Sequence, residues 1–94
     1  MIRVTVRTYG HMSQALKGTS AEIEFDGRTV GDLLAELITR YGAPLQRVLY
    51  PRGDTLSDMI YVLVNGKNIA HSGGVGAPLA AGDTVTILPI TAGG

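Results

Sequence analysis

The residues with the clearest chemical potential are the last two, Gly93 and Gly94. They follow an apolar run typical of a buried strand, residues 84–89, and a short segment, residues 90–92. Because glycine has no Cβ, such an end can thread a narrow channel and present its α-carboxylate to another protein's active site. A disordered glycine tail is the alternative interpretation. Fully extended, residues 90–94 would reach roughly 15 Å from the folded body.

Few other residues could do chemistry. The chain has no cysteine, which excludes disulfides, thiolate metal sites and cysteine nucleophiles. His11 and His71 are far apart and lack ligand spacing, so we expect no metal site. The glycine-rich segment at residues 73–76 lacks the Lys-Ser/Thr pair of a phosphate-binding loop. None of these residues therefore competes with the chain end as the candidate reactive group.

Composition indicates one small globular domain, residues 1–94. Apolar residues make up 45% of the chain, and eight basic residues balance eight acidic ones. Net charge near zero gives no electrostatic reason to expect nucleic acid or an anionic membrane as a partner. The first residues alternate in polarity, unlike a signal peptide, and no apolar run approaches a membrane span. We expect a cytoplasmic protein.

Alternating apolar and polar residues predict the strands. Apolar residues at 2, 4 and 6, and again at 21, 23 and 25, alternate with polar ones, as in half-buried strands. A polar loop, residues 10–20, separates these two strands. Residues 59–64 and 84–89 are also β-prone, and Asn65-Gly66 favours a hairpin turn into a short strand at residues 68–69.

One amphipathic helix is predicted over residues 30–41. Thr29 can cap its start, and Asp32 is favoured near its positive end. Gly42 can provide the left-handed residue after its last turn, and Pro44 prevents its continuation. Residues 45–50 are predicted to form a short helical turn. The apolar face of the helix has i, i+3, i+4 spacing and consists of Val30, Leu33, Leu34, Leu37, Ile38 and Tyr41.

The predicted fold class is α+β. One main helix can cover only one face of a sheet, which favours a mixed sheet of about five strands wrapped round that helix. With the first and last strands parallel in the middle, the connection satisfies the right-handed crossover preference. This arrangement is the β-grasp fold.

Several segments resemble the ubiquitin-like sulfur carriers of the MoaD/ThiS family. They are the hairpin Val64-Asn65-Gly66-Lys67-Asn68-Ile69, the entry Ala81-Gly82-Asp83-Thr84-Val85 and the ending Ile87-Leu88-Pro89-Ile90-Thr91-Ala92-Gly93-Gly94. The family includes small subunits of molybdopterin synthase, which often have two prolines where this chain has only Pro89. The residue 72–74 loop and the last strand are also similar to the carrier that supplies sulfide to a cysteine synthase.

The resemblance implies a chemistry and its partners. An ATP-using, ubiquitin-activating-like adenylyltransferase would adenylate the Gly94 carboxylate, and a sulfurtransferase would supply the sulfur that replaces AMP. The resulting thiocarboxylate would serve a sulfur-accepting enzyme. We expect the acceptor to be the large subunit of molybdopterin synthase, with a cysteine synthase or conjugation to target lysines as alternatives. The carrier would then be a co-substrate of its partner enzymes and not itself an enzyme. ATP would be used by the partner, and the carrier would bind no cofactor.

A docking surface is predicted beside the tail. Alternation places Val62, Val64, Val85 and Ile87 toward the helix, and Tyr61 and Leu63 outward. Partner contacts are then expected from Leu63, Leu88, Ile90, Thr91, Ala92, Arg3 and Arg7. In the alternative interpretation, Leu63 and Leu88 only cover an edge of the core and the two arginines are solvated.

Overall fold

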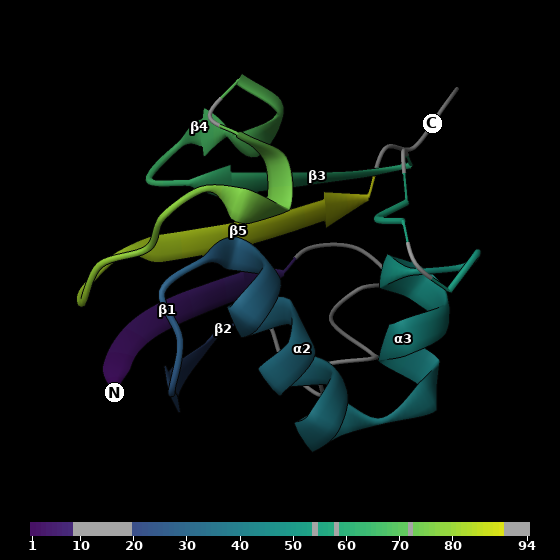
Figure 1. Ribbon diagram of the computed structural model, residues 1–94, viewed down its shortest axis with the longest axis horizontal. Coiled ribbons are helices and arrows are strands. Elements are labelled where there is room, and N and C mark those ends of the chain that lie inside the picture. Colours follow the sequence, from purple (N-terminus) through teal and green to yellow (C-terminus); the bar gives the residue numbers. More distant parts are fainter. Residues whose placement is uncertain (9–19, 54, 58, 72, 90–94) are drawn as a thin grey trace.

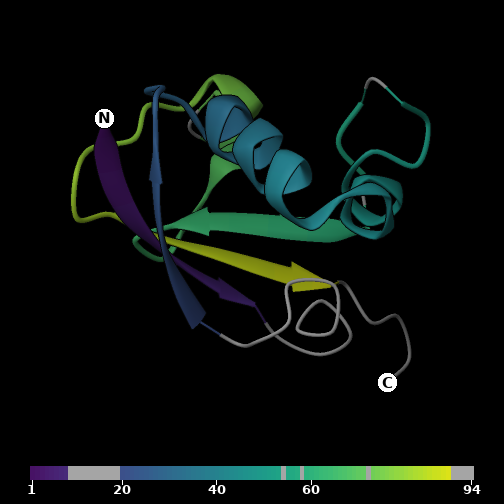
Figure 2. The same ribbon diagram turned by 90° about the horizontal axis from the view of Figure 1, so that it is seen from below.

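The computed structural model describes residues 1–8, 20–53, 55–57, 59–71 and 73–89. These residues form a five-stranded mixed sheet with two α-helices, α2 and α3, on one face (Figures 1 and 2). The strand order is β2-β1-β5-β3-β4. A mixed sheet that curves round one main helix is the β-grasp arrangement predicted from the sequence.

The first and last strands lie side by side in the middle of the sheet. β1 (Ile2–Thr8) pairs in parallel with β5 (Thr84–Pro89), from Thr5 opposite Thr84 to Thr8 opposite Ile87. β2 (Ser20–Phe25) pairs antiparallel with the other edge of β1. β1 and β2, the strands with the clearest alternation of apolar and polar residues, are therefore neighbours at one side of the sheet. The parallel pairing of the first and last strands in the middle agrees with the sequence-based prediction.

β3 (Ile60–Val64) pairs antiparallel with β5 along its whole length. It turns at Asn65-Gly66 into β4 (Lys67–Asn68), which is only two residues long. The predicted short strand at residues 68–69 was wrong by one residue, because Ile69 begins a 3-10 helix and its side chain is buried in the core. A second 3-10 turn occupies Gly74–Gly76.

Helix α2 (Val30–Tyr41) has the predicted bounds and the predicted cap. The Asp32 backbone N–H donates to the Thr29 hydroxyl at 3.2 Å, and the Thr29 backbone N–H donates back to the Asp32 carboxylate at 3.3 Å. This reciprocal capping box pairs backbone donors that the first turn leaves without a helical partner. The Gly42 N–H then bonds the Ile38 carbonyl at 2.7 Å, with a positive φ of 84° at Gly42.

The predicted turn after α2 is a full second helix, α3 (Ala43–Leu49). Pro44 ends α2 as expected, yet it also lies in the first turn of α3, where proline is tolerated because the N–H there has no helical partner. Leu45 and Leu49 of α3 are buried. No helix in the described ranges is long and apolar enough to cross a membrane.

The core lies between α2 and the sheet. Leu33, Leu34 and Leu37 of α2 are fully buried against the inward residues of the strands. The opposite face of the sheet is called the open face here, because neither α2 nor α3 covers it (Figure 2). By strand alternation, its residues on the four longer strands are Arg3, Thr5, Arg7, Ser20, Glu22, Glu24, Tyr61, Leu63, Thr84, Thr86 and Leu88.

Candidate functional site

β5 determines where the predicted reactive tail leaves the domain. The strand lies between β1 and β3, and its last residue, Pro89, is opposite Ile60 at the start of β3. Gly93 and Gly94, and the predicted contact residues Ile90, Thr91 and Ala92, lie outside the described residues. The structure therefore fixes the point of departure, and the roles of these five residues stay predictions.

Pro89 fits its position because of the hydrogen-bond register. The Asn65 N–H donates to the Thr84 carbonyl at 2.8 Å, so alternate residues of β5, including Leu88, direct their backbone groups toward β3. The backbone nitrogen of Pro89 is therefore on the side of β1, where the described pairing between β1 and β5 has already ended at Ile87. A proline at this position removes no hydrogen bond between β5 and β3.

An apolar patch lies on the open face beside this exit. Tyr61 is opposite Leu88, and Leu63 is opposite Thr86 on the same pair of strands. Leu63 and Leu88 are half-buried, whereas Tyr61 is 47% exposed. The outward orientation predicted for Leu63 and Leu88 is confirmed. Tyr61 was missing from the predicted contact residues, although the alternation of β3 already placed it outward.

The two predicted arginines occupy different places on the open face. Arg7 is opposite Thr86, in the row that contains Leu63, and is thus a neighbour of the apolar patch. Arg3 lies four residues earlier on β1, roughly 13 Å away along the strand. It pairs with Glu24 at 3.8 Å, with both side chains more than half exposed. The structure therefore brings Arg7, but not Arg3, to the patch.

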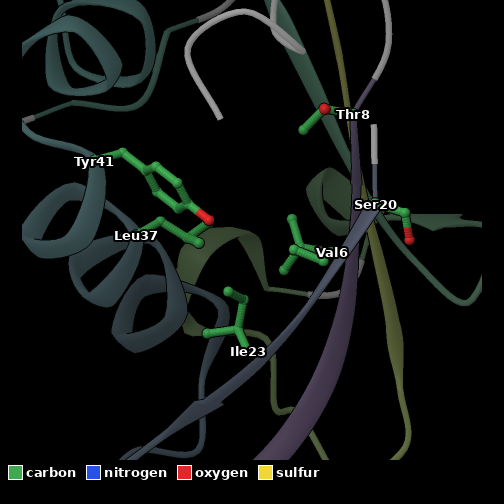
Figure 3. Close-up of a pocket in the computed structure, with 7 residues that line it drawn as sticks. Val6, Thr8, Ser20, Ile23, Leu37 and Tyr41 are labelled. Carbon is green, nitrogen blue, oxygen red and sulfur yellow. The ribbon is translucent and has the colours of Figure 1, made fainter. Parts of the chain in front are cut away.

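The small pocket beneath the sheet does not compete with this site. Figure 3 shows Leu37 and Tyr41 from α2 facing Val6 and Ile23, with the Tyr41 hydroxyl directed into the space between the helix and the strands. Its volume is about 10 Å³, enough for about one water molecule. As lined by the described residues, it is too small for a substrate.

The described residues around the end of β5 form a surface of mixed character. Their side chains are apolar, hydroxyl-bearing or cationic, namely Tyr61, Leu63, Thr86, Leu88 and Arg7. A buried core holds the strands behind them in a fixed register. Within the described residues this surface offers apolar, hydroxyl and cationic contacts in fixed positions and no cluster that could hold a metal ion.

Comparison with known proteins identifies the relatives of this chain. The model of the ThiS family matches residues 6–94. Sulfur carrier protein CysO of Mycobacterium tuberculosis is 32% identical over 78 residues, which cover 82% of this chain and 84% of that protein. Small archaeal modifier protein 3 of Haloferax volcanii is 33% identical over 69 residues, 73% of each chain. The solution structure of small archaeal modifier protein 1 from Methanosarcina acetivorans matches with a TM-score of 0.86 at 30% identity, covering 100% of this chain and 98% of that one.

Proposed function

Since the chain belongs to the ThiS family, we propose that it is a sulfur carrier whose reactive group is the Gly94 carboxylate. One observation carries the proposal most directly. The family match extends through residue 94, and β5 ends at Pro89 beside the apolar patch of Tyr61, Leu63 and Leu88. A partner that docks on this patch would meet the tail at the same place.

The proposed chemistry begins with activation. A carboxylate resists nucleophiles because it is negatively charged and resonance-stabilised, and an acyl-adenylate removes both obstacles. The Gly94 carboxylate oxygen would attack the α-phosphate of ATP on an adenylyltransferase, releasing pyrophosphate. A sulfide-class nucleophile, supplied through a sulfurtransferase, would then attack the carbonyl carbon, and AMP would leave. The product would be a thiocarboxylate on Gly94.

In this mechanism the carrier is a co-substrate and its partners are the catalysts. Gly93 and Gly94 would allow the tail's backbone to approach the walls of a narrow channel, because neither has a Cβ. Tyr61, Leu63 and Leu88 would bury apolar area against the partner, and Arg7 would meet an acidic group on it. ATP would bind to the adenylyltransferase, and the carrier would hold no cofactor of its own.

The recipient of the sulfur is a separate question. A molybdopterin synthase large subunit, the recipient preferred on the sequence resemblance, and a cysteine synthase both take sulfur from a carrier end of this kind. The similarity to known proteins fits both recipients, so an experiment has to distinguish them. Incubating the thiocarboxylate form with each candidate enzyme and its sulfur-free substrate separates the two, because only the true recipient should return the carrier to its carboxylate form.

Intact-mass spectrometry tests the carrier proposal. Purified chain incubated with its cognate adenylyltransferase, ATP and a sulfide source should gain the mass difference of one sulfur for one oxygen, located on Gly94. Omitting ATP provides the control and should leave the mass unchanged. A full reaction that leaves the carboxylate intact, with an adenylyltransferase shown to be active on another carrier, would overturn the proposal.

A protein modifier is the second candidate, because two of the relatives are named small archaeal modifier proteins. In that role an isopeptide bond would join Gly94 to a lysine of a target. Lys67 is the last lysine or arginine of the chain, so trypsin would leave residues 68–94 on the target. An Ala92→Arg variant expressed in the native cell would instead leave Gly-Gly on target lysines. Such remnants would favour the modifier, and their absence beside a thiocarboxylate would favour the carrier.

A further inference from the structure

The edge of the sheet next to β3 is only partly covered. β4 pairs with Leu63 and Val64 (Figure 1), and then the chain turns away into the 3-10 helix Ile69–His71. Within the described ranges, no strand pairs with Ile60–Val62 on the side away from β5. Three of the five residues of β3 therefore form a strand edge that a further strand could extend.

A groove of about 560 Å³ runs along this uncovered edge. Ile60 and Val62, which point toward the helix side of the sheet, line it together with Tyr61, which points to the open face. The groove thus follows the uncovered edge of the strand, with lining residues from both of its faces. Across from β3 its apolar lining comes from Tyr50 and Leu56 before the strand and from Ile69 and Val75 after it.

The backbone register shows what the groove offers. The Asn65 N–H donates to the Thr84 carbonyl of β5, and Leu63 and Tyr61 lie two and four residues before Asn65 along the chain. Their backbone groups therefore face β5, and those of Ile60 and Val62 face the groove. An extended peptide in this groove would find hydrogen-bonding groups along the strand and apolar positions on both sides of it. These are the two components of recognition by β-strand addition.

The groove begins where the tail departs. Ile60 lines the groove and is also the residue opposite Pro89. A protein that binds the chain close to Pro89 would therefore lie beside the first residues of β3. Both candidate functions require an enzyme that activates Gly94, so the activating enzyme is the partner common to the carrier and the modifier.

We propose that the β3-edge groove seats an extended apolar segment of the enzyme that activates Gly94, added as a sixth strand beside Ile60. This rests on the proposed function, since it assumes that Gly94 is activated by a partner. It adds a second contact to the one at the open-face patch, along the uncovered edge of β3. Together the two contacts would fix the orientation of the folded domain on the enzyme.

Val75→Glu provides the main test. Val75 is 40% exposed at the rim of the groove, so a glutamate there can stay solvated in the free protein and place a charge against an apolar segment in the complex. Calorimetric titration of the full chain with the purified adenylyltransferase should show affinity lower by about tenfold or more, the loss typical of disrupting a central contact. Val75→Thr, which keeps the shape, should bind nearly as the wild type does.

Ala35→Glu is the matched control, because Ala35 is exposed on α2 and does not line the groove. It adds the same charge and should leave the affinity unchanged. Hydrogen exchange gives a second readout, in which the amides of Ile60 and Val62 should slow when the enzyme is added. Unchanged affinity of Val75→Glu, or unchanged exchange at both amides, would overturn the proposal.

The outcomes separate this proposal from the one it rests on. A wild-type chain that receives no AMP from an active enzyme contradicts the proposed function itself. A chain that is adenylated while Val75→Glu binds equally well contradicts only the groove. Sedimentation of the chain alone tests for a second copy of the chain in the groove. A dimer that dissociates in the Val75→Glu variant would assign the groove to that second copy and overturn the proposal.

Discussion

Asn65 joins the hairpin turn to the start of β5. Its φ of 52° is the only positive value among the described non-glycine residues. The side chain donates to the Asp83 carboxylate at 3.0 Å and accepts from the Thr84 N–H at 2.9 Å. Asp83 also accepts from the Ala80 N–H at 2.8 Å. One asparagine thus fixes the turn before β4 and the entry of the strand that leads to the tail.

Replacing Asn65 should reveal both parts of this role. Asn65→Ala removes the side-chain bonds and keeps a Cβ at a left-handed residue, so we expect a loss of about 1–3 kcal/mol in the free energy of unfolding. Asn65→Gly removes the same bonds without the backbone strain and should cost less. Urea denaturation of the two variants measures the difference. Equal losses would show that the backbone conformation at residue 65 carries no strain.

Asp32 makes the start of α2 sensitive to pH. Hydrogen bonds from the Arg28 backbone N–H and from Thr29 hold the pKa of the Asp32 carboxyl below its ordinary value of 3.8. A group with a lowered pKa in the folded state stabilises the fold above its unfolded pKa and loses that contribution as the pH falls through its folded pKa. Asp32 should therefore stabilise the protein at neutral pH and contribute least in strong acid.

The expected result is a difference in stability between Asp32→Ala and the wild type that becomes smaller in acid. Asp32→Ala should unfold at a lower urea concentration than the wild type at neutral pH, and the gap should narrow as the pH falls below 3.8. Glu22→Ala, which removes an exposed carboxylate from the edge strand β2, controls for the change in net charge. A gap that stays constant with pH would mean that the Asp32 charge takes no part in the cap.

At the scale of elements, helix α2 is joined to the sheet by both polar and apolar contacts. Arg40 near its last turn pairs with Glu36 at 2.8 Å and also donates to the Glu24 carbonyl of β2 at 2.8 Å. The second bond ties the end of the helix to the edge strand. Leu37, on the buried side of the same helix, faces Val6 and Ile23 of β1 and β2 (Figure 3). Polar and apolar contacts therefore join one helix to the same pair of strands.

Leu37→Ala should cost about 2–5 kcal/mol in the free energy of unfolding, because Leu37 is completely buried and its truncation leaves a cavity. Ile38→Ala, at a half-buried neighbouring position, should cost clearly less. Denaturant unfolding followed by circular dichroism compares the two variants. A denaturation midpoint unchanged in Leu37→Ala would contradict the assigned face of the helix.

For the whole molecule, the described core lies within residues 4–87. Among the described residues, the last buried apolar one is Ile87. Stability and reactivity should therefore separate along the chain, the former residing in residues before Pro89 and the latter at Gly94. This separation is what a domain needs if its end is to enter another protein while its body stays folded.

Deleting Gly94 tests this separation. We expect adenylation by the activating enzyme to be lost and the melting temperature to stay that of the wild type, because no described core residue is removed. Gly94→Ala keeps a terminal carboxylate and adds only a Cβ, so it reports how closely the channel fits the backbone. A clear fall in melting temperature on the deletion would show that the end of the chain is part of the fold.

Much of the fold follows from local patterns in the sequence. The spacing of Leu33, Leu34 and Leu37 predicted α2, and Thr29 and Asp32 predicted its cap, because helix period and capping depend on neighbouring residues. Alternation likewise predicted which face of each strand is buried, including the outward position of Leu63 and Leu88. The Gly93-Gly94 ending, with the strand before it, directed attention to the chain end as the reactive group.

The tertiary structure decided what depends on residues distant in sequence. It extended the turn after Gly42 into helix α3, because packing of Leu45 and Leu49 stabilises a helix too short to form alone. It separated Arg3 from Arg7 relative to the patch, since only the parallel register of β1 and β5 determines which arginine adjoins Thr86. The β3-edge groove arises in the same way, from β4 ending before it covers Ile60 and from segments on both sides of the strand packing round it.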